Sequence, residues 1–138
     1  MKKLLAAICL AFLLAGPVQA EDPIGVTVAE LAKTGLSWDG TALPAYPTTR
    51  PEITILRITI PAGIALPMHK HPVINVGMLL SGELTVTTKD GQTLHLKAGD
   101  PVVEVVNKWH YGKNTGKNPA VIIVFYVGTP DIPVTIKQ

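Results

Sequence analysis

From Glu52 onward the chain breaks into short runs rich in β-branched residues, and this pattern limits the fold more than any other feature. The runs read EITILRITI, VGMLLSGELTVTT, PVVEVV and AVIIVFYVG. β-Branched and aromatic residues favour strands, while the Gly, Pro, Asn and Asp between the runs favour turns. Many short strands with frequent turns indicate a β-sandwich or barrel. We therefore expect an all-β domain over residues 51–138.

One hairpin within this domain can be placed from the sequence. Residues 89–92 read Lys-Asp-Gly-Gln, and Asp-Gly tolerates the positive φ angles of a type I′ turn. Side chains alternate along a strand, so Leu84 and Val86 share one face, as do Leu94 and Leu96. The pattern predicts two paired strands with these four apolar side chains on one side.

The first 20 residues have the pattern of a secretory leader. Lys2 and Lys3 precede an apolar run over residues 4–15, and small residues at positions 18 and 20 suit a signal peptidase. The run is shorter than the roughly 20 residues of a membrane span. We expect a cleaved signal peptide over residues 1–20 and a periplasmic or secreted protein.

The composition of the mature chain excludes several partners. The only cysteine, Cys9, leaves with the leader, so no disulfide can form. Without Lys2 and Lys3 the remaining ten Lys and Arg balance ten Asp and Glu. A balanced charge gives no reason to expect nucleic acid or, after leader cleavage, a membrane as partner.

Residues 21–50 are expected to form a helix and an arm in front of the barrel. Thr27 and Glu30 have the spacing of a capping box, and Gly35 suits the end of a short helix. Three prolines exclude a helix from the segment Ser37–Pro51. This segment is predicted to lie as an extended arm on the body.

Three of the four histidines have a spacing that suits metal binding. His69 and His71 are two residues apart, so on a strand both point to the same face, and a second strand can bring His110 opposite them. Three imidazoles can bind a divalent transition metal such as Zn, Mn, Cu, Fe or Ni. The alternative is that they are hydrogen-bonded core residues of a degenerate site. His95 alternates with two leucines and is expected to face solvent.

Glycines, histidines and asparagines recur at fixed spacings around these histidines. The first series is Gly63, five residues, His69, one, His71, three, Asn75, six, Gly82. The second series is Gly99, five residues, Val105, one, Asn107, two, His110, three, Asn114. Both series resemble the two motifs of the cupin superfamily. The resemblance implies a jelly-roll barrel with a metal held inside by His69, His71 and His110.

Three identities depart from the motifs. Val105 and Asn107 replace a proline and a glycine at a turn, where asparagine tolerates the left-handed conformation. Asn75 replaces the glutamate that is the fourth metal ligand of the family. Its neutral carbonyl oxygen should lower the affinity for hard cations. Asn75 either stays off the metal, which leaves three histidines and open positions for water, O₂ or a chelating substrate, or it ligates the metal weakly or hydrogen-bonds a bound ligand.

Glu104 can compensate for the missing carboxylate. It stands among four valines, and the matching position in cupins usually points inward. A buried charge needs a partner, which can be a metal-bound water, a histidine N–H or Arg57. Glu104 would then orient a ligand imidazole or act as a general base. The alternative is that it lies solvated at the barrel rim.

The aromatic residues are expected to contribute little to the pocket. Trp109 and Tyr111 flank His110 on a strand, so both should point away from it and serve packing or a dimer contact. Phe125 and Tyr126 point to opposite faces, so one of the two should lie in the core.

These features favour an exported cupin that binds a divalent metal and acts on a small oxygen-bearing molecule, as a dioxygenase- or isomerase-type enzyme. One alternative is a non-catalytic protein that binds a small ligand or the metal itself. A second alternative is a structural dimer with a degenerate site. The resemblance also implies a homodimer, because cupins often pair through their sheets.

Overall fold

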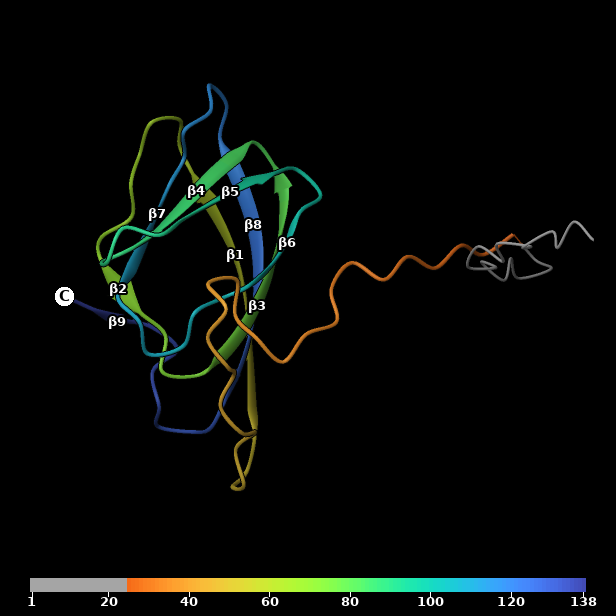
Figure 1. Ribbon diagram of the computed structural model, residues 1–138, viewed down its shortest axis with the longest axis vertical. Coiled ribbons are helices and arrows are strands. Elements are labelled where there is room, and N and C mark those ends of the chain that lie inside the picture. The colour runs from red at the N-terminus through yellow and green to blue at the C-terminus, as the bar shows by residue number, and fades with distance from the viewer. Residues whose placement is uncertain (1–24) are drawn as a thin grey trace, which may run out of the picture.

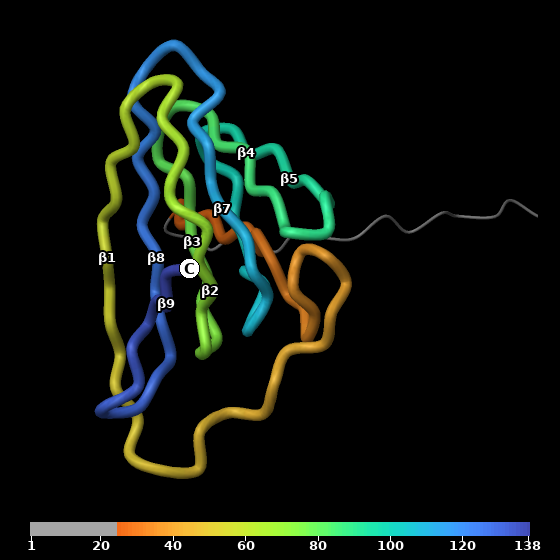
Figure 2. Tube along the Cα trace, turned by 90° about the vertical axis from the view of Figure 1, so that its left-hand side faces the viewer, coloured from red at the N-terminus to blue at the C-terminus, as the bar shows by residue number. Residues whose placement is uncertain are grey.

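The computed structural model describes residues 25–138, which form an all-β jelly-roll barrel of two facing antiparallel sheets (Figure 1). The first sheet has the order β1 (Glu52–Ile60), β8 (Ala120–Gly128), β3 (Ile74–Ser81) and β6 (Pro101–Val103). The second has the order β5 (Thr93–Lys97), β4 (Glu83–Thr88), β7 (His110–Lys113), β2 (His69–Lys70) and β9 (Ile136–Lys137). The predicted fold class is confirmed. Figure 2 shows β1 and β8 on one side of the molecule and β4 and β5 on the other.

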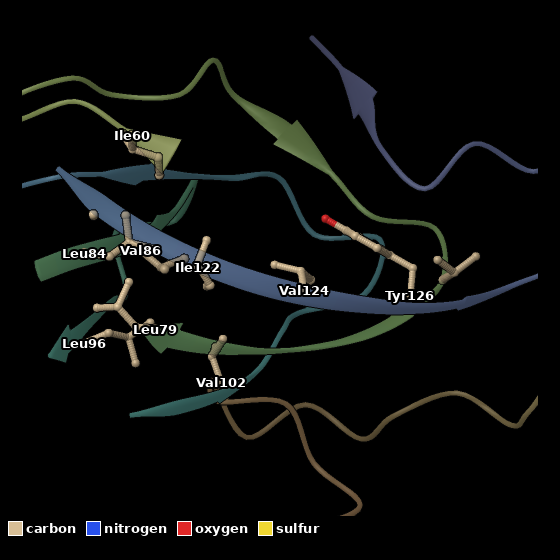
Figure 3. Packing of buried hydrophobic residues seen from close by; sticks show 11 residues of the cluster. Ile60, Leu79, Leu84, Val86, Leu96, Val102, Ile122, Val124 and Tyr126 are labelled. Carbon is tan, nitrogen blue, oxygen red and sulfur yellow. The ribbon is translucent and has the colours of Figure 1, made fainter. Parts of the chain in front are cut away.

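The core lies between the two sheets and follows from alternation along the strands. In β8, Ile122, Val124 and Tyr126 are buried, while Phe125 is 41% exposed on the outer face. Tyr126 is therefore the core member of the aromatic pair. Figure 3 shows these side chains with the residues that they pack against, among them Ile60, Leu79, Leu84, Val86, Leu96 and Val102.

The predicted hairpin is present as β4 and β5. Leu84 pairs with Leu96 and Val86 with Leu94, so the four apolar side chains share the inner face as expected. The prediction of a type I′ turn was wrong. Among residues 89–92 only Gly91 has a positive φ, of 89°, and its N–H donates to the carbonyl of Thr88. A turn followed by one left-handed glycine closes the loop instead.

The predicted helix at Thr27–Gly35 is wrong. Residues 25–36 are exposed throughout and have no helical hydrogen bonding, and in Figure 1 this segment runs away from the barrel. A capping box supplies only local hydrogen bonds, and a short helix in water needs an apolar face packed on something. No such surface covers this segment. The signal peptide predicted for residues 1–20 lies outside the described residues.

The arm after this segment contacts the barrel, as predicted. The N–H of Trp38 donates to the carbonyl of Val103 over 2.9 Å, and the carboxylate of Asp39 pairs with the ammonium of Lys108 at 2.9 Å. The arm is not straight, because it turns back at Gly40, whose φ is 84°. Along residues 25–138 there is no helix of the length and hydrophobicity that crossing a membrane requires.

Candidate metal site

The three predicted histidines meet inside the barrel. His69 on β2 and His110 on β7 are direct partners across the ladder, and His71 follows β2 and bridges to Val106. One ring nitrogen from each of the three lies within 4.8 Å of the others. The ring centroids are 4.5–5.0 Å apart. The three imidazoles can therefore hold one metal ion.

Hydrogen bonds orient each imidazole and fix its tautomer. Nδ1 of His69 lies 2.7 Å from the carbonyl of Pro67, Nδ1 of His71 lies 2.8 Å from that of Val134, and Nδ1 of His110 lies 2.8 Å from that of Lys108. A carbonyl only accepts, so each Nδ1 carries the proton and donates. Each Nε2 is left with its lone pair free, which is the arrangement that metal-binding histidines adopt.

Burial keeps the three rings neutral. It lowers the pKa of His69, His71 and His110, and the pKa of His71 falls to about 4. At neutral pH the lone pairs are available without loss of a proton. Three converging lone pairs repel one another until a cation lies between them, so the donor set fits a metal ion.

Asn75 supplies a further observation that fits a cation or a polar ligand. It lies on β3, is completely buried and lines the same cavity. Its amide N–H donates to the carbonyl of Val73 over 3.3 Å, whereas its Oδ1 has no hydrogen-bond partner. A buried acceptor without a partner costs free energy. A metal ion or a ligand N–H or O–H at this oxygen would remove that cost.

Glu104 is buried beside the histidines and is not solvated at the rim. It is 8% exposed, and its Oε2 lies 3.8 Å from Nε2 of His110. Burial raises the pKa of this carboxyl to about 7, although the side chain of Trp38 and the N–H of Val105 oppose the shift. The indole N–H of Trp38 is near enough to Glu104 to lower its pKa, but the two do not reach hydrogen-bond geometry, so Oε2 of Glu104 and the indole N–H both remain without a partner. Arg57, a suggested partner, is exposed on β1 instead.

The site opens into one cavity of about 360 Å³. Its polar lining comes from the histidines, Asn75, Glu104, Tyr126, Thr135 and Lys137. The rest of the wall is apolar and comes from both sheets, chiefly Leu56, Ile58, Ile60, Leu66, Leu84, Val86, Ile122 and Val124.

Sequence reasoning excluded the right residues from this cavity but missed others. Trp109 and Tyr111 do not line it, and His95 is exposed on β5 and bonded to Thr85 at 2.9 Å. Thr135 and Lys137 were missed, because they belong to a short C-terminal segment without a strand pattern. The Trp38 contact was missed because nothing in the arm pointed to the site.

A jelly-roll barrel with converging imidazoles is the architecture that the cupin resemblance implies. A family model described as "Cupin domain" matches residues 56–126, and this chain belongs to that family. A germin-like protein of Oryza sativa subsp. japonica, germin-like protein 8-14, is 30% identical over 90 residues, which cover 60% of this chain. The chain spans only 42% of that relative's length.

Two solved structures show the same fold. A conserved protein of Klebsiella pneumoniae with a double-stranded β-helix domain is 21% identical, with a TM-score of 0.54, 70% of this chain covered and 81% of that one. Bacillus subtilis oxalate decarboxylase, described with Mn(II) centers, is 25% identical, with a TM-score of 0.53. The match covers 62% of this chain and 24% of the decarboxylase.

Proposed function

We propose that this chain is an exported cupin that binds one divalent transition metal through His69, His71 and His110 and acts on a small oxygen-bearing molecule. The observation that carries the proposal is the convergence of three neutral imidazoles, whose nitrogens lie within 4.8 Å, beside the unpartnered Oδ1 of Asn75. The Mn(II) centers of the structurally similar decarboxylase support a divalent metal. A bound metal would supply Lewis-acid polarisation of an oxygen-bearing group.

In this proposal two side chains complete the chemistry. Glu104, with its pKa raised to about 7 and its carboxyl 3.8 Å from His110, serves as a general acid or base at neutral pH. Asn75 contributes a neutral oxygen to the metal or to the bound molecule. The apolar wall excludes water from the reacting atoms, and this strengthens each polar interaction there. Dioxygenase- and isomerase-type reactions are the candidates.

A non-catalytic binding protein is the second candidate, favoured by the cavity itself. A volume of about 360 Å³ and a mainly apolar wall with a few converging polar groups are typical of small-molecule pockets. Oxygen consumption and product formation on a panel of small diols, enols and thiols separate the two. Tight binding without product would favour the binding protein.

The first test is elemental analysis of the protein exported under its own leader. We expect one equivalent of Zn, Mn, Cu, Fe or Ni per chain, and loss of it in the alanine variants of His69, His71 and His110. His95→Ala is the matched control, because His95 is exposed and away from the cavity. Absence of metal from the wild type, or equal uptake by the alanine variants, would overturn the proposal.

Export and dimerisation complete the proposal. The same expression experiment tests export through the location of the processed chain. A homodimer would bury an apolar row on the outer face of the first sheet, where exposed Phe125 pairs with exposed Ile55 on one side and exposed Val76 on the other. Sedimentation of the wild type and of a Phe125→Glu variant tests this, since only a dimer formed through this face would dissociate in the variant.

A further inference from the structure

The C-terminal segment forms part of the wall of the metal site. The carbonyl of Val134 accepts from Nδ1 of His71 at 2.8 Å, and Oγ1 of Thr135 lies 3.2 Å from the same nitrogen. Strand β9 then pairs with β2, and the N–H of Gln138 donates to the carbonyl of Met68 over 3.0 Å. The last residues of the chain are therefore held against the cavity by the strand that carries the histidines.

The register of this pairing places a lysine in the row of the metal ligands. Lys137 lies directly opposite His69, and His69 lies directly opposite His110. Directly opposed residues of an antiparallel pair point to the same face, and Lys137, although an exposed residue of β9, lines the cavity. By contrast, Lys70 alternates to the outer face, where its Nζ lies 5.2 Å from the ring centre of Trp109.

With a divalent ion bound, the charges around the cavity would not balance without an anion. Lys137 brings one positive charge, and a divalent ion between the histidines would bring two more. Among the lining residues Glu104 is the only carboxyl, because asparagine stands at position 75. In the described part of the chain Lys108 is the only lysine or arginine that forms an ion pair, so Lys137 has no acidic partner.

We propose that Lys137 is a specificity-determining residue that selects a small monocarboxylate, whose carboxylate lies between the metal and the lysine ammonium. The rest of the ligand would be short and apolar, because the wall beyond the polar groups is formed by side chains such as Ile58, Ile122 and Val124. This inference deepens the proposed function and rests on it for the metal. The position of Lys137 directly opposite His69 is the reason for proposing a carboxylate as the ligand.

The test compares butyrate with its neutral isostere butyramide by calorimetric titration of the zinc-loaded protein. We expect the wild type to bind butyrate about 10-fold more tightly than butyramide, since a hydrogen bond to a charged group has roughly that effect. Lys137→Met should reduce this preference to the part that the zinc ion supplies, and Lys137→Arg should retain most of it. Lys70→Met is the matched control, because it removes the same charge from the same pair of strands but from the outer face.

Two results would overturn the inference: no preference in the wild type, or an equal preference in Lys137→Met and Lys70→Met. Zinc content measured on the same samples separates this failure from failure of the proposed function. Where the wild type takes up no zinc and none of Mn, Cu, Fe or Ni either, the proposed function fails. The same titration of the metal-free protein then still decides the role of Lys137, since loss of the butyrate preference in Lys137→Met alone supports it and any other result overturns it.

Discussion

Glu104, the residue that directly follows β6, and Asn75 on β3 are joined by a hydrogen bond of 3.1 Å from the N–H of Glu104 to the carbonyl of Asn75. Both side chains line the cavity beside the histidines. The motif position held by a glutamate in cupins is neutral here, and a carboxyl stands directly next to it. The acidic group of the site thus lies on the segment that follows β6, where burial raises its pKa to about 7.

The first prediction concerns the pH dependence of stability in the metal-free protein. The pKa of Glu104 is about 7 in the folded chain against an ordinary 4.5. The folded state therefore holds a proton that the unfolded state releases between these values. The protonated carboxyl makes its full contribution to the free energy of unfolding below pH 4.5. Between pH 4.5 and about 7 this contribution falls by about 1.4 kcal/mol per pH unit, and it is lost once the pH has risen through 7. Glu104→Gln is neutral throughout, so its stability relative to the wild type should increase over this window.

Urea denaturation in the presence of a chelator at pH 5, 6, 7 and 8 measures this difference. The histidines act in the opposite direction: their lowered pKa values, about 4 for His71, mean that stability is lost as the pH falls below 6.5. For His71 and His110 that effect is common to both proteins and cancels in the comparison, whereas the charge of Glu104 raises the pKa of His69 in the wild type alone. Glu52→Gln on the exposed end of β1 is the control. A difference between Glu104→Gln and wild type that does not change with pH would contradict the assignment.

The second prediction concerns the orientation of Asn75. Asn75→Glu restores a carboxylate whose charge and oxygen donor suit Mn(II), so the affinity for this ion should rise about 10-fold or more. Asn75→Gln adds the same methylene to this fully buried position without the charge and is the matched control. Calorimetric titration with Mn(II) gives the affinities. Equal values for the two variants would show that the side chain at position 75 does not reach the metal.

The histidine site could be predicted because its information is local and periodic. The two-residue spacing of His69 and His71 fixes a shared face on any strand, and the motif spacing supplies His110. Asn107 was likewise predicted to tolerate the left-handed region, and its φ is 57°. The orientation of Glu104 could not be decided, because β6 ends at Val103 and alternation stops there.

The remaining errors have a common cause. The capping box at Thr27 was a correct local pattern, but a helix needs a surface to pack on, and the sequence does not say whether one exists. Lys137 was missed for the converse reason. Its strand has two residues and no pattern of its own, and only the pairing with His69 places it in the site.

The third prediction compares two motif glycines with positive φ. Gly82 has a φ of 77°, and a Cβ there would lie 2.7 Å from the backbone atoms Cα of Ala120 and O of Pro119. Gly99 has a φ of 95° and open space around it. Gly99→Ala should cost only the left-handed conformation, about 1–2 kcal/mol. Gly82→Ala should cost at least about 2 kcal/mol more, because backbone cannot move aside. Urea midpoints test this, and similar losses would contradict the packing argument.

The last prediction concerns Asn114, the final residue of the second motif. It is completely buried, its Nδ2 donates to the carbonyls of Ile60 at 2.9 Å and Asn118 at 2.8 Å, and its Oδ1 accepts from the N–H of Gly116 at 2.9 Å. Asn114→Ala should lower the free energy of unfolding by about 2–4 kcal/mol, because the buried carbonyl of Ile60 loses its donor. Asn118→Ala, which keeps its backbone carbonyl and is exposed, should cost less than about 0.5 kcal/mol.

Metal content per folded chain should be equal in both variants, because Asn114 ties the ends of β1 and β8 together and does not line the cavity. A selective loss of metal in Asn114→Ala without loss of stability would mean that this asparagine supports the site rather than the barrel.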